Sequence, residues 1–221
     1  MILRREKEWI VEHGRKLITA GLTSGTGGNL SVLGGDGKQI LITPTGVPYS
    51  EMTPDDVVVM DRDGRITEGG RKPSSEWGFH VALYRTRSDV RAVVHTHSVY
   101  ATTLACLHWE IPAVHYLVGF AGRKVPLAPY ATYGTEDLAR HVTETIGSSN
   151  AVLLANHGLV AVGPDLAHAF NTAEEIEFVA RLYYLARCAG EPQLLPDDEM
   201  DRVIEKFKDY GPKASSDNDA S

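Results

Sequence analysis

Segments with a helical spacing of apolar residues alternate with β-rich segments along the chain, and this alternation restricts its fold more than any other feature. Neither type forms an uninterrupted block, so the chain mixes helices and strands throughout. Helices are expected at residues 4–20, 74–87, 100–107, 165–189 and 197–208. Strands are expected at residues 30–33, 39–43, 57–61, 65–67, 90–98 and 152–155, the first four as two hairpins around glycine-containing turns.

The length of 221 residues suits one domain, because single cores keep growing to about 250 residues before chains divide. The hydrophobic fraction of 43% and the charged fraction of 23% are those of an ordinary globular protein. We expect the domain to cover residues 1–212. Residues 213–221 are polar and rich in Ser and Asp, which predicts a disordered C-terminal tail.

Charge and composition exclude several classes of partner. A net charge of -7 and the lack of a basic stripe argue against nucleic acid, although small anions can still bind at local N–H groups. No signal-peptide pattern or long apolar run appears, so no membrane association is expected. Only Cys106 and Cys188 are present, which we expect to be buried thiols; with no disulfide framework, a cytoplasmic location is predicted.

Three histidines form the strongest chemical pattern. His95 and His97 lie two residues apart in a β-type segment, so their rings project from the same face. His157 follows a compact strand and precedes Gly158, where the backbone can approach a ligand closely. Together with Glu76 these residues would supply nitrogen and oxygen donors suited to zinc. The alternative is a pair of hydrogen-bonded strand histidines. The remaining histidines are expected to be surface or core hydrogen-bonding residues, and among them His80 and His141 are expected to be structural.

Several segments combine glycine and hydroxyl residues that could expose backbone N–H groups to a phosphate. They are Gly27-Gly28-Asn29-Leu30-Ser31, Thr43-Pro44-Thr45-Gly46 and Pro73-Ser74-Ser75-Glu76. Ser74 and Ser75 precede a predicted helix, whose N-terminus favours an anion. Each segment alone could equally be an ordinary turn or helix cap. No Walker A loop or dinucleotide fingerprint occurs, which disfavours ATP and NAD as ligands.

Taken together, eight ordered motifs resemble the class II aldolase family, and within it most closely the L-fuculose-1-phosphate aldolases. The motifs are Gly25-Thr26-x-Gly28-Asn29-x-Ser31, Leu41-Ile42-Thr43-Pro44-Thr45-Gly46, Pro73-Ser74-Ser75-Glu76-Trp77, Val93-Val94-His95-x-His97, Pro112-Ala113-x-His115-Tyr116, Ala128-Pro129-Tyr130-Ala131-Thr132, His157-Gly158-Leu159 and Glu205-Lys206-Phe207-Lys208-x-Tyr210-Gly211. The resemblance implies a single α/β domain with a central, largely antiparallel sheet covered by helices. It also implies a homotetramer with active sites between neighbouring subunits.

The resemblance assigns roles to particular residues. It implies that His95, His97 and His157 bind one Zn²⁺ per subunit, with Glu76 as a fourth ligand that also acts as an acid/base group. The implied phosphate-binding residues are Asn29, Thr43, Gly46, Ser74 and Ser75. Tyr116 from the adjacent subunit would be a second acid/base residue. Tyr210 and Phe207 would line the aldehyde end of the site, where Tyr133 adds a hydroxyl group to the family pattern.

The implied reaction is a retro-aldol cleavage of L-fuculose 1-phosphate, or a related ketose 1-phosphate, to dihydroxyacetone phosphate and L-lactaldehyde. Such an activity belongs to fucose metabolism and needs no Schiff-base lysine, because the metal acts as the electron sink. Three alternatives stay open. They are an L-ribulose-5-phosphate 4-epimerase or a methylthioribulose-1-phosphate dehydratase of the same family, and a non-catalytic, adducin-like oligomerisation module without a metal site.

Overall fold

The strands of the chain form one sheet in the computed structural model, which describes residues 3–208. They are β1 (Asn29–Leu33), β2 (Gln39–Ile42), β3 (Val58–Asp61), β4 (Ile66–Glu68), β5 (Ala92–Thr96), β6 (Leu127–Ala128), β7 (Ala151–Leu154) and β8 (Gly158–Gly163). The eight strands lie in the order β4-β3-β2-β1-β5-β8-β7-β6. Neighbouring strands are antiparallel except for β6 and β7, which pair in parallel. This sheet confirms the expected largely antiparallel α/β architecture.

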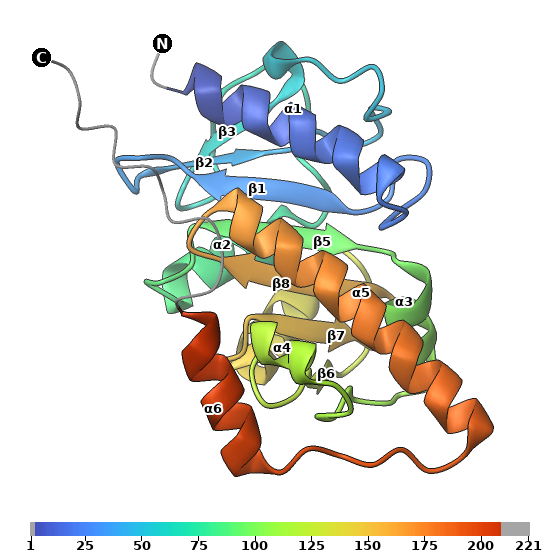
Figure 1. Cartoon of the computed structure of the whole chain (residues 1–221). Helices are drawn as coiled ribbons and strands as arrows, with labels where there is room; N and C mark the ends of the chain where they lie inside the picture. Colours follow the sequence, from blue (N-terminus) through green and yellow to red (C-terminus); the bar gives the residue numbers. More distant parts are fainter. Residues whose placement is uncertain (1–2, 209–221) are drawn as a thin grey trace, which may run out of the picture.

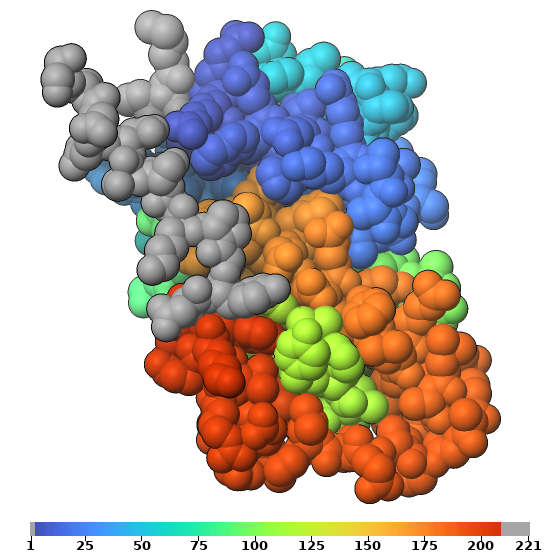
Figure 2. Space-filling model, in the orientation of Figure 1, coloured from blue at the N-terminus to red at the C-terminus, as the bar shows by residue number. Residues whose placement is uncertain are grey.

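Helices cover both faces of the sheet. They are α1 (Arg4–Thr19), α2 (Trp77–Thr86), α3 (Val99–Cys106), α4 (Glu136–Ile146), α5 (Leu166–Ala189) and α6 (Asp197–Phe207), with the short 3-10 helices η1 (Pro54–Asp56) and η2 (Tyr116–Phe120). Figure 1 shows α1 and α5 crossing the same face of the sheet, and Figure 2 shows how their side chains cover it.

Alternation along the strands divides the apolar residues between two cores. In β8, Leu159 and Ala161 belong to the core with α1, α3 and α5. Val160 and Val162 point the other way and join the core with α2 and α4. Since both faces are covered, strands such as β7 and β8 are buried at every position. The two helical layers therefore fix the register of the central strands, on which the candidate site is built.

The predicted elements are largely confirmed, with ends that differ by at most three residues. The sequence interpretation missed β6, α4 and β8. β8 reads Gly-Leu-Val-Ala-Val-Gly and has no polar alternation, because both of its faces are buried. α4 had a recognisable start, since the Thr135 hydroxyl accepts a hydrogen bond from Leu138 N, and Leu138, Val142 and Ile146 repeat at helical spacing on its buried face.

The prediction that both cysteines are buried is wrong. Cys106 and Cys188 are exposed, each in the last turn of its helix. In α5 the last buried residue is Ala180, so Cys188 lies beyond the part of the helix that packs on the sheet. Within residues 3–208 no helix is long and apolar enough to cross a membrane. The predicted tail at 213–221 lies outside the described residues and stays a prediction.

Candidate metal and substrate site

Three backbone features bring the candidate ligands together. His95 lies near the end of β5, His97 follows directly after it, and Glu76 is the residue that precedes α2. His157 lies in the tight connection between β7 and β8, just after Asn156, whose φ of 56° turns the chain. Because β8 pairs with β5, this connection is held beside the end of β5.

Gly158 makes the close approach of these segments possible. A Cβ atom at this position would lie 2.3 Å from the backbone oxygen of Thr96 and 3.1 Å from Cδ2 of His97. Gly28 plays a similar part on the other side, where a Cβ atom would lie 2.5 Å from the backbone oxygen of His95. The site therefore depends on glycine at both points of contact.

The four candidate ligands converge as the sequence predicts. One donor atom from each of Glu76, His95, His97 and His157 lies within 4.8 Å of the others. The Nε2 atoms of His95 and His97 are 3.0 Å apart. The two oxygens of Glu76 lie 3.2 Å from Nε2 of His95 and of His157. Such a cluster of three imidazoles and one carboxylate has the composition of a divalent metal site.

The charge states of these groups suit coordination. Burial lowers the pKa of His97 to about 3 and that of His157 to about 4, with repulsion from His95 adding to the effect. Burial alone would raise the pKa of Glu76, but His95, His157 and a hydrogen bond from Asn29 outweigh it and hold the pKa well below the ordinary value. Metal ligands must be deprotonated, so the neutral rings of His97 and His157 and the ionised carboxylate of Glu76 meet that requirement.

The hydrogen bonds around the cluster also fit a bound cation. Nδ1 of His95 lies 2.9 Å from the backbone oxygen of Leu159, so in the neutral ring the proton is on Nδ1 and Nε2 keeps its lone pair. Oε1 of Glu76 is buried and has no hydrogen-bond partner among the described residues. A buried, ionised oxygen without a donor is costly, and a metal ion would satisfy it. The residues therefore fit a divalent metal better than a pair of ordinary strand histidines.

A cavity of about 450 Å³ opens beside the cluster. Three residues of the cluster line it: Glu76, His97 and His157. The predicted phosphate-binding residues Asn29, Gly46, Ser74 and Ser75 line it too, as do Tyr130 and Tyr133. Thr26, Thr45 and Asn156 also line it, and the sequence interpretation did not single them out as binding residues. Their loops carry the glycine and hydroxyl pattern, which is the signal that could have identified Thr26 and Thr45.

Thr43 holds the loops in place and does not line the cavity. It is buried, its hydroxyl accepts a hydrogen bond from Leu30 N, and its carbonyl accepts one from Ser74 N. The Tyr49 hydroxyl donates a hydrogen bond to the carbonyl of Gly28 at 2.9 Å and so anchors the glycine-containing segment 27–31. The three predicted phosphate segments are thus brought together, with Thr43 between them.

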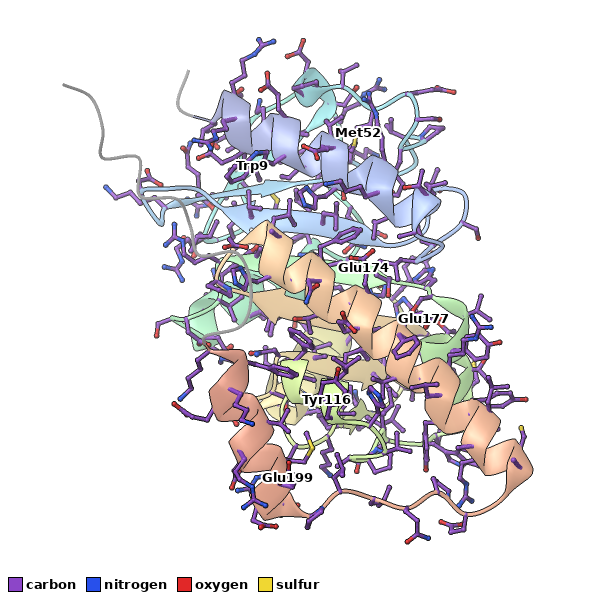
Figure 3. The ribbon with its side chains drawn as sticks, in the orientation of Figure 1. Trp9, Met52, Tyr116, Glu174, Glu177 and Glu199 are labelled. Atoms are coloured by element: carbon purple, nitrogen blue, oxygen red, sulfur yellow. The ribbon has the colours of Figure 1, made fainter. Side chains whose placement is uncertain are left out.

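Tyr116 and Phe207 lie together, away from this cavity. Tyr116 is 48% exposed on η2, and its ring centre is 6.2 Å from that of Phe207 on α6. Neither residue lines the cavity of its own chain. Figure 3 shows the position of Tyr116 relative to α5 and α6. The other predicted residue, Tyr210, lies outside the described residues.

Comparison with known proteins identifies the family. The family model described as "Class II Aldolase and Adducin N-terminal domain" matches residues 8–184, which span most of the chain and all four candidate ligands. The chain belongs to the class II aldolase family. This agrees with the resemblance drawn from the ordered motifs and with the sheet described above.

Individual relatives are similar over nearly their full length. The chain is 51% identical to a 5-deoxy-D-ribulose 1-phosphate aldolase of Bacillus thuringiensis serovar kurstaki, over 96% of this chain and 99% of the relative. It is 46% identical to a 5-methylthioribulose-1-phosphate/5-deoxyribulose-1-phosphate aldolase of Rhodospirillum rubrum, over 93% and 92%. A solved L-fuculose 1-phosphate aldolase superposes with a TM-score of 0.90 at 48% identity, covering 91% of this chain and 95% of that one.

These likenesses establish the class of protein. The chain is a class II aldolase, an aldehyde-lyase of a family that acts on phosphorylated sugars. The adducin-like alternative predicted a chain without the metal histidines, whereas all three are present and converge with Glu76. The relatives differ in the sugar that their names specify, so the family assignment leaves the aldehyde half of the substrate to be determined.

Proposed function

We propose that this chain is a zinc-dependent ketose-1-phosphate aldolase that cleaves the bond between C3 and C4 of its substrate. The products are dihydroxyacetone phosphate and a short aldehyde. The observation that carries the proposal is the convergence of Glu76, His95, His97 and His157 beside a cavity. The other side of this cavity is formed by the loops that the sequence predicts to bind phosphate. The two features match the two ends of the C1–C3 fragment, a phosphate and a pair of oxygens on adjacent carbons.

The phosphate-binding end of the cavity is formed by Ser74, Ser75, Gly46 and Asn29. Ser74 and Ser75 lie just before α2, where the positive end of the helix dipole favours an anion. This local arrangement allows an acidic protein with a net charge of -7 to bind a phosphorylated sugar. The C1 phosphate would then fix the distance between the sugar carbons and the histidine cluster.

The bound metal would supply Lewis-acid stabilisation of the negative charge that develops on the substrate as the C3–C4 bond breaks. Glu76 lies at the boundary between the cluster and the cavity and is ionised. In the cleavage direction the carboxylate would first take up a proton from water, in place of the one lost from the C4 hydroxyl, and pass it to C3 of the departing dihydroxyacetone phosphate. In the reverse direction the carboxylate would remove that proton from C3. One residue thus serves both as a ligand and as the proton carrier at C3.

A second proton group is needed at the C4 hydroxyl, and we assign it to Tyr116 of an adjacent subunit in a homotetramer. Tyr116 is exposed, lies beside Phe207 and does not reach the cavity of its own chain. A neighbouring subunit could place this aromatic pair, together with Tyr210, over the aldehyde end. Removal of the C4 proton as the bond breaks would release the aldehyde.

Complementation tests this assignment directly. Glu76→Gln and Tyr116→Phe should each lose turnover as pure proteins. In a mixture refolded or co-expressed in equal amounts, about one quarter of the sites would combine an intact Glu76 from one subunit with an intact Tyr116 from the next, if the subunits mix at random. Recovery of activity near that fraction supports the shared site. A mixture as inactive as the two pure variants would refute it.

We propose that the sugar is a small ketose 1-phosphate whose terminal carbon lacks a hydroxyl group. L-fuculose 1-phosphate would give L-lactaldehyde, and 5-deoxyribulose 1-phosphate would give acetaldehyde, so the candidates differ only beyond C4. The names of relatives at 51% and 46% identity favour the five-carbon sugar, and the L-fuculose 1-phosphate aldolase at 48% identity supports the six-carbon sugar. Within one chain, Tyr130 and Tyr133 line the cavity and are available to discriminate between the two sugars.

A substrate panel with a coupled assay for dihydroxyacetone phosphate tests the reaction. Zinc-loaded protein should release dihydroxyacetone phosphate from 1-phosphates of the deoxyketoses and from no 5-phosphate ketose. Epimerisation of L-ribulose 5-phosphate, or loss of water from methylthioribulose 1-phosphate without release of dihydroxyacetone phosphate, would contradict the proposal and favour the epimerase or the dehydratase.

A further inference from the structure

A ladder of buried polar side chains extends from Glu76 into the core between β1 and α2. On α2 and the residue before it, Glu76, His80 and Tyr84 repeat every four residues and therefore share one side of the helix. On β1, Asn29 and Ser31 alternate with apolar residues and share one face of the strand. The two sets face each other, and every one of these side chains is buried.

Hydrogen bonds link the two sets alternately. Nδ2 of Asn29 lies 2.9 Å from Oε2 of Glu76, and Oδ1 of Asn29 lies 2.5 Å from Nε2 of His80. On the other side of the ring, Nδ1 of His80 lies 2.7 Å from the Ser31 hydroxyl. The Ser31 hydroxyl is also 2.7 Å from that of Tyr84. The sequence interpretation treated His80 only as a structural histidine.

The chemistry of these groups fixes the direction of every bond in the ladder. An ionised carboxylate only accepts, so the amide of Asn29 must turn its NH₂ group toward Glu76 and its oxygen toward His80. An amide oxygen also only accepts, so Nε2 of His80 must carry the proton. Nδ1 is then an acceptor, which Ser31 satisfies as a donor while accepting from Tyr84.

All donors therefore point from Tyr84 toward Glu76. The ladder is not a route for proton transfer, because the Asn29 amide interrupts it. Its effect is on the position of the carboxylate: Oε2 of Glu76 is hydrogen-bonded to Asn29, while Oε1 keeps no hydrogen-bond partner among the described residues. Burial also lowers the pKa of His80 to about 3, which keeps the ring neutral as the ladder requires.

We propose that His80 is a positioning residue for the metal centre: as its Nε2–H tautomer it fixes the orientation of the Asn29 amide, and through it the Glu76 carboxylate. This inference rests on the proposed metal site. If the Asn29 amide turned over, its oxygen would face the carboxylate oxygen Oε2. Glu76 would then lose its donor and move from the position in which Oε1 faces His157.

Two variants of similar size separate this role from simple packing. The amide nitrogen of Asn stands where Nδ1 of a histidine would be, whereas that of Gln stands where Nε2 would be. His80→Gln should therefore keep the donor to Asn29 and a Zn²⁺ affinity close to that of the original protein. His80→Asn should lose the donor and weaken Zn²⁺ binding about 10–100-fold, the usual cost of removing an outer-sphere partner. Competition with a chromophoric chelator measures both affinities.

The outcomes are distinct. Equal Zn²⁺ affinity in both variants, whether retained or lost, would overturn the proposal, because the direction of the bond would not matter. The imidazole ¹⁵N shifts of His80 in the unsubstituted protein give a test that needs no variant: the proposal requires the proton on Nε2, and a proton on Nδ1 would refute it. Failure of the unsubstituted protein to bind Zn²⁺ would instead refute the proposed function, and the ¹⁵N shifts would still decide the tautomer.

Discussion

Substitution of Gly158 by Ala should disturb the fold and the metal site together, because this glycine lets the start of β8 lie close against the end of β5. The added Cβ atom would lie 2.3 Å from the backbone oxygen of Thr96, which cannot rotate away, and 3.1 Å from Cδ2 of His97. Overpacking of this kind costs about 1–3 kcal/mol. In a protein of this size each kcal/mol lowers Tm by about 2–4 °C, so a cost near 2 kcal/mol predicts a fall of about 4–8 °C.

Calorimetry of the metal-free protein measures the Tm change, and chelator competition measures Zn²⁺ affinity in the same preparation. The matched control is Gly35→Ala, since Gly35 is exposed in a turn and a Cβ atom there meets nothing within 4 Å. The control should leave both quantities unchanged. If Gly158→Ala also left both unchanged, the close packing of the strands around the histidines would be wrong.

Three further variants or conditions test the site. Glu76→Gln should keep the fold and lower turnover by about 10²–10⁴-fold in the dihydroxyacetone phosphate assay, because one positioned acid/base group contributes that much; full activity would remove Glu76 from the reaction. Tyr49→Phe should lower the free energy of urea unfolding by about 1–3 kcal/mol, since the Gly28 carbonyl loses a buried donor. An unchanged free energy of unfolding would mean that the hydrogen bond from Tyr49 to Gly28 does not stabilise the fold. The pKa values of His97 and His157, about 3 and about 4, lie below the ordinary 6.5. The unfolded chain therefore binds more protons, and the metal-free protein should lose stability as the pH falls from about 6.5 toward 4. Replacing both rings by Asn should flatten that dependence, and an unaltered pH profile would contradict it.

The strand periodicity was enough to predict that His95 and His97 converge, because side chains two residues apart in a strand must share a face. The place of His157 depended on β8, which the sequence interpretation missed. β8 has no alternation of polar and apolar residues because helices cover both sides of the sheet. Only the pairing of β5 with β8 brings His157 to the other two histidines. That pairing joins segments far apart in the sequence, so a local sequence pattern cannot predict it.

The polar ladder between β1 and α2 could not be predicted from the sequence either. The spacing of four between Glu76, His80 and Tyr84, and of two between Asn29 and Ser31, is visible in the sequence. What the sequence does not specify is that these faces of β1 and α2 lie against each other. Without knowledge of that contact, His80 is indistinguishable from an ordinary core histidine, and Asn29 from any other polar residue of a glycine-rich segment. With it, the Asn29 amide connects His80 to Glu76.

The most direct test of the account is the metal content of the purified chain measured together with its aldolase activity. We expect one Zn²⁺ per chain, loss of dihydroxyacetone phosphate release when a chelator removes the metal, and recovery when Zn²⁺ is added back. His95→Ala should bind less than stoichiometric Zn²⁺ and stay inactive after the same treatment. Undiminished cleavage by protein with a metal content near zero would contradict the account and would require a lysine-based mechanism instead.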